Sequence, residues 1–138
     1  MKTLYETQAT AVGGRAGCAA SADGRLRVRL DLPKCLGGDD REGTNPEQLF
    51  AAGFAAAFLS AIKGAAAGRG VDIAPDSNVT ASVALGSTDG RYALKVALSA
   101  DLPGLDDATC RRIIEDARAA CPYSRATRGN IEVRVEVG

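Results

Sequence analysis

The four cysteines are the side chains of this sequence best suited to chemistry. No two of them form a Cys-x-x-Cys pair, and the sequence has no histidine. This combination argues against an ordinary zinc site and removes both Ser-His-Asp and Cys-His catalysis. Any activation of a thiol must therefore come from Arg, Lys, Asp, Glu, Tyr or a helix terminus. The cysteines are Cys18, Cys35, Cys110 and Cys121.

Cys121 is the cysteine with the most unusual surroundings. It ends a predicted helix and begins the stretch CPYSRATRGN, residues 121–130. Nearby arginines favour a thiolate, whereas the negative end of the helix dipole opposes it. Cys110 lies roughly 16 Å away along the same helix, too far for a disulfide, which needs Cα atoms within about 7 Å. Spacing alone slightly favours a structural Cys121, and it favours packing or incidental roles for the other three.

Two charged residues stand beside predicted turns and helix ends. Glu47 opens a predicted helix, where the helix dipole stabilises a carboxylate, and capping is its simplest interpretation. Arg15 follows a Gly-Gly turn and, taken alone, is a solvated charge. From residue types and spacing, the sequence therefore predicts thiol chemistry at most, without a defined site.

The helix that carries Glu47 is built mostly from small residues. Thr44 or Asn45 can cap it, Pro46 suits its first turn, and glycines end it near residues 68–70. Such a helix lets another backbone approach closely, and one short chain has little material to surround it. We therefore expect a homodimer with this helix near the interface; a central helix under its own sheet is the alternative. The helix looks too short and too rich in Gly and Ala to span a membrane.

The other predicted elements alternate between strands and a second helix. Alternating apolar residues predict the strands, Asp-Gly predicts a tight hairpin turn, and Asp106 or Asp107 caps a second helix that Pro122 ends. Because hairpins join the strands, the order β-β-α-β-β-α-β predicts an α+β fold with antiparallel sheet in a single domain, residues 1–138. The strands are expected at 4–12, 26–32, 79–85, 94–100 and 131–137.

Length and charge limit the classes of function. The 138 residues carry 17 Lys and Arg against 17 Asp and Glu, so the formal net charge is zero. This balance argues against binding to nucleic acid or to a membrane surface. The first residues have no apolar segment of the kind a signal peptide needs, so a cytoplasmic protein is expected.

Three stretches resemble signatures of a known family. GGRAG at 13–17, TNPEQLFAAG at 44–53 and CPYSRATRGN at 121–130 are similar to those of the organic hydroperoxide resistance proteins, a subfamily of the OsmC/Ohr family. The resemblance extends over essentially the whole chain. It implies an α+β fold with antiparallel sheets and two central helices, in an intertwined homodimer with two active sites at its interface.

The resemblance also implies a reaction. Members of this family reduce organic and fatty-acid hydroperoxides to alcohols through a peroxidatic thiolate, which becomes a sulfenic acid. A resolving cysteine then forms a disulfide with it, and dihydrolipoamide or a lipoylated protein reduces that bridge. No metal, haem or flavin cofactor is implied.

The family's site residues match this chain at all but one catalytic position. Arg15 matches the arginine that holds the thiolate, Glu47 the carboxylate that orients this arginine, and Cys121 the resolving cysteine. Phe54 matches an aromatic position of the same helix, where contact with substrate is expected. Where the family has its peroxidatic cysteine, this sequence has Ala57. The chain as written is therefore expected to be inactive.

Two explanations for Ala57 are open. The intact Arg15, Glu47 and Cys121 favour an alanine introduced to trap one state of a genuine peroxidase, while a natural paralogue that lost catalysis is the alternative. Glu47 and Ala57 are separated by roughly 15 Å along one helix. If both line one pocket, Glu47 and Arg15 must reach the Ala57 site of a partner chain.

Two other functions remain to be weighed. One is a non-catalytic dimer that binds a fatty acid, a hydroperoxide or a lipoyl group in an apolar interface pocket. The other is a member of the wider family with a different preferred oxidant. Restoring a thiol at position 57 separates the first from the peroxidase, and comparing organic hydroperoxides with hydrogen peroxide separates the second.

Overall fold

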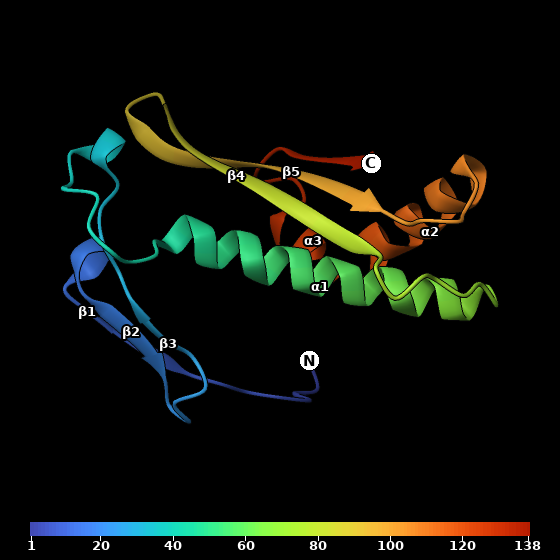
Figure 1. The fold of residues 1–138 in the computed structure, drawn as a ribbon, viewed down its shortest axis with the longest axis horizontal. Helices are drawn as coiled ribbons and strands as arrows, with labels where there is room; N and C mark the ends of the chain where they lie inside the picture. The colour runs from blue at the N-terminus through green and yellow to red at the C-terminus, as the bar shows by residue number, and fades with distance from the viewer. The chain divides into compact units, whose positions relative to one another are not determined.

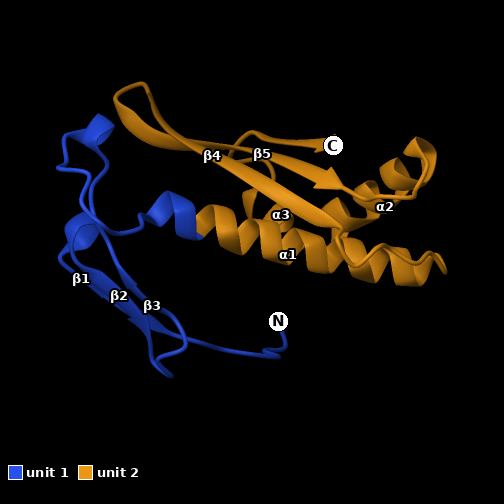
Figure 2. Cartoon of the chain, in the orientation of Figure 1, with its two compact units in different colours: residues 1–49 blue, residues 50–138 orange.

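The computed structural model describes residues 1–138. The chain forms two compact units, residues 1–49 and residues 50–138 (Figure 2). Each unit has its own three-stranded sheet. Helices and strands together give the α+β class that the sequence predicted.

The first unit contains a short antiparallel sheet in the order β1-β2-β3. The predicted strands at 4–12 and 26–32 are present but shorter, and β2 was missed. Its residues CAAS have neither strong β propensity nor a polar–apolar alternation, so no pattern announced it. The elements are β1 (Ala9–Val12), the 3₁₀ turn η1 (Gly14–Ala16), β2 (Cys18–Ser21), β3 (Arg27–Arg29) and the 3₁₀ turn η2 (Lys34–Leu36).

The turn between β1 and β2 presents Arg15. Gly13 begins it with φ +81°, a left-handed conformation that glycine adopts without strain. Gly17 closes it, and its backbone runs so near Val12 that a Cβ there would overlap the Val12 carbonyl oxygen. The glycines of the first signature are therefore demanded by the turn.

Helix α1 (Pro46–Gly68) begins and ends as the sequence predicted. The Gln48 backbone N–H donates to Asn45 Oδ1 at 2.9 Å, so Asn45 is the cap, and the Thr44 hydroxyl donates to Gln48 Oε1 at 2.6 Å. One face of the helix is buried, and the side chains opposite it are small and exposed. The buried residues are Phe54, Phe58, Ile62 and Ala66.

The length of α1 corrects one expectation. With 23 residues it is long and apolar enough to cross a membrane by length and composition, so it is not too short. The core helix of a soluble protein passes the same test. The buried aromatic and aliphatic face of α1 belongs to the hydrophobic core of the second unit.

The second unit contains a mixed sheet in the order β4-β5-β6. Strands β4 (Asn78–Thr88) and β5 (Arg91–Asp101) form the expected hairpin, and both residues of its turn, Asp89 and Gly90, have positive φ. Strand β6 (Val133–Val137) pairs with β5 in parallel. The expectation of purely antiparallel sheets joined only by hairpins was therefore wrong for this strand.

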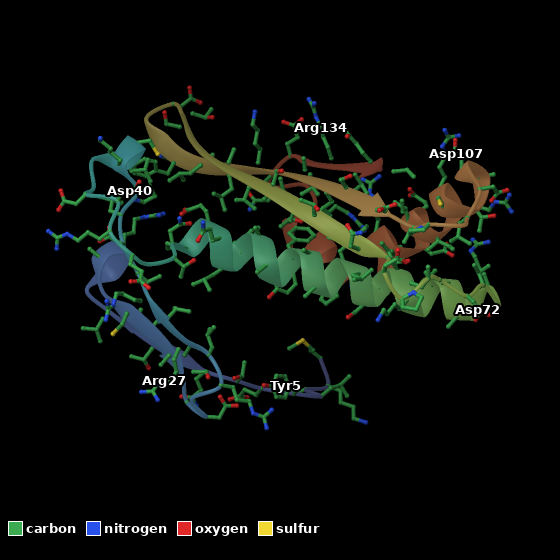
Figure 3. The ribbon with its side chains drawn as sticks, in the orientation of Figure 1. Tyr5, Arg27, Asp40, Asp72, Asp107 and Arg134 are labelled. Carbon is green, nitrogen blue, oxygen red and sulfur yellow. The ribbon has the colours of Figure 1, made fainter.

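The crossover from β5 to β6 explains the parallel pairing. It consists of α2 (Asp107–Ala120), which Asp106 caps by accepting from the Thr109 N–H at 3.0 Å, and α3 (Pro122–Thr127), which was not predicted. Helices α1 and α2 bury their apolar sides with one face of the sheet in a single cluster, and Arg134 of β6 projects from the other face (Figures 1 and 3). Period-two alternation predicts a strand but does not identify its neighbour.

Candidate active site

Arg15 and Glu47 form a paired charge in the first unit. Arg15 Nη1 donates to Glu47 Oε2 and Arg15 Nη2 donates to Glu47 Oε1, each at 2.7 Å. The turn η1 presents the arginine and the first turn of α1 presents the carboxylate. Two parallel hydrogen bonds fix the plane of the guanidinium as well as its position. The structure thus brings together two residues that are 32 positions apart in the sequence.

The environment of this pair keeps Glu47 charged. The hydrogen bond from Arg15 lowers the pKa of Glu47, and burial opposes that shift without cancelling it. The Glu47 side chain is 18% exposed and the Arg15 side chain 38% exposed. Because the pair is only partly open to water, its charges are screened less than those of a surface ion pair. The result is an oriented cation that suits a thiolate or a polarised oxygen.

Ala57 lies on α1 in the second unit, on the strip of partly buried residues beside the core. Its methyl group provides no nucleophile, donor or acceptor. The same helix carries Glu47, ten residues earlier. Position 57 therefore contributes only an apolar surface.

Cys121 is completely buried, with 0% of its surface exposed. It joins α2 to α3, and its backbone N–H donates to the Ala117 carbonyl at 2.8 Å. Its side chain belongs to the hydrophobic cluster against which Ala57 packs. The placement suits the resolving position implied by the family resemblance, although the residue's role stays a prediction.

Three aromatic rings cluster near the beginning of α1, namely Phe50 and Phe54 of this helix and Tyr123 of α3. Phe54 is fully buried, with its ring centroid 6.0 Å from that of Phe50 and 5.7 Å from that of Tyr123. Substrate contact by Phe54 stays a prediction. Sequence reasoning missed Tyr123 as a member of this group, although the third signature contains it.

The remaining cysteines are free and lie elsewhere. Cys110 is buried on α2, where burial raises the pKa of its thiol and the carboxylates of Asp107 and Asp106 raise it further. Cys18 and Cys35 are exposed. No group of three or more His, Cys, Asp or Glu side chains in the chain is arranged to hold a metal ion.

These features can be compared with known proteins. The family model described as OsmC-like protein matches residues 37–136. An organic hydroperoxide resistance protein of Xanthomonas axonopodis pv. citri is 45% identical over 132 residues, which cover 96% of this chain and 93% of that relative. The chain belongs to the OsmC-like family.

Within that family, the chain is similar to the organic hydroperoxide resistance proteins, as the three signatures predicted. A crystal structure of such a protein from Legionella pneumophila matches with a TM-score of 0.93 and 42% identity, covering 99% of each chain. A second, from Vibrio cholerae, has captopril bound in one of its active sites. It matches with a TM-score of 0.93 and 44% identity over 99% of this chain and 94% of its own. The OsmC/Ohr-like fold is confirmed.

Proposed function

We propose that this chain is an organic hydroperoxide peroxidase in architecture that lacks its reactive thiol. The observation that carries the proposal is the bidentate Arg15–Glu47 pair, kept intact in a chain that has Ala57. An oriented arginine beside a carboxylate is what a thiolate peroxidase needs to hold its nucleophile. As written, the chain turns over essentially no hydroperoxide.

The reaction proposed for a thiol at position 57 balances in two steps. The thiolate sulfur attacks one peroxide oxygen, the O–O bond breaks, and the leaving alkoxide takes a proton to become the alcohol. The Cys121 thiol then attacks the sulfenic acid, which forms a disulfide and releases water. Dihydrolipoamide, free or on a lipoylated protein, returns the disulfide to two thiols and is itself oxidised to lipoamide.

We further propose that the chain acts as a cytoplasmic homodimer. Among the fourteen buried hydrophobic side chains of the core, residues 1–49 contribute only Leu30. All four residues of β1 are exposed, and a small sheet with so little burial is at best marginally stable. A second copy would cover this sheet, and the chain, residues 1–138, would complete its packing as one domain in the dimer.

The small exposed side chains of α1 supply a surface for that copy. Small residues allow two backbones to approach, as the sequence suggested. In such a dimer, Arg15 and Glu47 of one protomer serve the position-57 site of its partner. The exposed small residues are Ala52, Ala56, Ser60, Gly64, Ala67 and Gly68.

The substitution Ala57→Cys tests the proposed function. With cumene hydroperoxide and dihydrolipoamide, the variant should consume peroxide at least about 10³-fold faster than the chain as written, because it regains the nucleophile. Ala57→Ser is the control without a thiol, and Ala119→Cys places a thiol at an exposed position of α2. Similar rates in the chain as written and in Ala57→Cys would refute the proposal.

A non-catalytic binder is the second candidate function. The apolar position 57 and the buried Cys121 favour it, since neither reacts readily with a peroxide. Absence of turnover in Ala57→Cys, together with binding of a fatty acid or lipoamide by the chain as written, would support the binder. A preference of Ala57→Cys for hydrogen peroxide over tert-butyl hydroperoxide would instead indicate a family member with another oxidant.

A further inference from the structure

Tyr123 lies directly against Gly53 of α1. A Cβ built on Gly53 would stand 3.3 Å from the Tyr123 hydroxyl oxygen and 3.5 Å from the ring carbon Cε2. The ring also packs against two phenylalanines, with centroids 6.5 Å from Phe50 and 5.7 Å from Phe54. A methyl group at position 53 would therefore crowd the phenol hydroxyl, which would have to shift by a few tenths of an ångström.

Position 57 follows Gly53 by one helical turn on the same side of α1. Side chains four residues apart on a helix are neighbours, with Cβ atoms about 5–6 Å apart. They also lean toward the helix N-terminus, so atoms beyond the Ala57 methyl extend over the turn that contains Gly53. A ligand atom on the N-terminal side of the Ala57 methyl would therefore lie over the turn that Tyr123 contacts.

The Tyr123 hydroxyl is a hydrogen-bonding group among apolar side chains. The neighbouring side chains of Phe50, Phe54 and Ala57 offer neither a hydrogen-bond donor nor an acceptor. The Tyr123 hydroxyl makes no hydrogen bond within the chain, and the side chain is 40% exposed rather than locked in the core. A phenol can both donate and accept, so it suits the oxygen of a hydroperoxide or an alcohol.

We propose that Tyr123 is a specificity-determining residue of the position-57 site, where its hydroxyl hydrogen-bonds the oxygen of an organic hydroperoxide or of the product alcohol. The proposal rests on the proposed function, because it assumes that this site takes such ligands. Gly53 has a positioning role, since it leaves the space for the hydroxyl. Sites with a hydrogen-bonding group discriminate against ligands that cannot pair with it.

Two probes of nearly the same shape test the proposal on the chain as written. The first is 2-phenyl-2-propanol, and the second is tert-butylbenzene, in which a methyl group replaces the hydroxyl. Tyr123→Phe should weaken binding of the alcohol about five- to tenfold, as expected for one hydrogen bond, and leave binding of the hydrocarbon unchanged. Dissociation constants come from titrations followed by nuclear magnetic resonance.

Two further variants separate this role from general packing. Tyr92→Phe removes a hydroxyl from a side chain that is 86% exposed and should change neither constant. Gly53→Ala should weaken binding of the alcohol more than that of the hydrocarbon, because the new methyl group would shift the Tyr123 hydroxyl by a few tenths of an ångström. In the Ala57→Cys background, Tyr123→Phe should raise KM for cumene hydroperoxide more than it lowers kcat.

The possible results separate the role of Tyr123 from the proposed peroxidase function. Unchanged binding of the alcohol in Tyr123→Phe, or an equal loss for both probes, overturns the role of Tyr123 and leaves the proposed function standing. If the chain as written binds neither probe and Ala57→Cys shows no turnover, both proposals fall. Selective loss for the alcohol in Tyr123→Phe, with Tyr92→Phe unchanged, supports the assignment.

Discussion

The predicted functional residues of the two units lie in opposite surroundings. Residues 1–49 hold a complete pair of charges, with two hydrogen bonds of 2.7 Å, in a unit that contributes only Leu30 to the buried hydrophobic side chains. Residues 50–138 hold a well-packed apolar wall around Ala57, but they have no reactive group at that position. The polar groups thus lie in the poorly buried unit, and the well-packed unit offers only apolar surface at position 57.

Both the charge pair and the aromatic rings are held in place without a thiol at position 57. Arg15 on the turn η1 and Glu47 at the start of α1 hold each other through two hydrogen bonds, so the pair needs no sulfur to stay in place. The rings of Phe50, Phe54 and Tyr123 pack against one another, and Phe54 belongs to the hydrophobic core. The charge pair and the aromatic rings can therefore each be tested separately.

Removing Arg15 in the Ala57→Cys background is the strongest test of whether the Arg15–Glu47 pair takes part in the reaction. Arg15→Met should lower kcat/KM for cumene hydroperoxide about 10²–10³-fold, because an oriented charge of this kind stabilises the reacting atoms. Arg15→Lys should retain part of the activity, since lysine keeps the charge but not the bidentate geometry. Peroxide consumption is the measurement.

A surface arginine of the same unit is the control for this prediction. Arg25→Met removes an exposed guanidinium whose nearest carboxylate, Asp23, is 3.7 Å away, and activity should stay the same. If Arg15→Met keeps full activity, the paired charge has no part in the reaction, and the contrast between the two units loses its functional meaning.

The exposed small side of α1 is tested through the dimer. Ala56→Glu places a carboxylate on the exposed small side of α1, and it should raise the dimer dissociation constant at least about 100-fold, because burying an unpaired charge is costly. Sedimentation equilibrium measures the constant. Ala119→Glu adds the same charge to an exposed position of α2 and should have little effect. A chain that is monomeric at every concentration would contradict the expected homodimer.

The smallest expected effect concerns pH and the stability of the pair. The pKa of Glu47 in the folded chain lies below its usual value of 4.5, so its contribution is complete above about pH 4.5 and is lost as the pH falls through the folded pKa. Glu47→Gln should lower the free energy of unfolding by about 1.5 kcal/mol at neutral pH and reduce the acid-induced loss of stability. Urea unfolding between pH 3 and 7 measures both.

A more exposed ion pair provides the comparison for Glu47. The Arg69–Asp116 pair has one 2.6 Å hydrogen bond, and both side chains are about two-fifths exposed. Asp116→Asn should therefore cost less stability than Glu47→Gln. An equal or larger loss would mean that partial burial does not strengthen the Arg15–Glu47 pair.

Local sequence patterns predicted the elements whose causes are local. Asn45 and Pro46 predicted the start of α1, Asp106 predicted the start of α2, and Asp89-Gly90 predicted the β4–β5 turn. Each depends on a capping group or a backbone conformation within a few residues. The parallel partner of β6 and the existence of β2 depend on distant strands, so the local pattern did not reveal them.

The candidate site shows the same limit. Capping was the simplest interpretation of Glu47 from its position alone, whereas its carboxylate pairs with Arg15, 32 residues away. Tyr123 had no periodicity or motif chemistry that linked it to Gly53, because their contact joins α3 to α1. Only the family resemblance connected Arg15, Glu47 and Cys121 in advance.

The arrangement at the beginning of α1 divides the work between neighbouring residues. Asn45 accepts from the open backbone N–H of Gln48, so this cap of the helix does not depend on Glu47. A change in the acid at position 47 can consequently alter the electrostatics of the site without unravelling the first turn. Such separation lets evolution adjust reactivity and architecture one residue at a time.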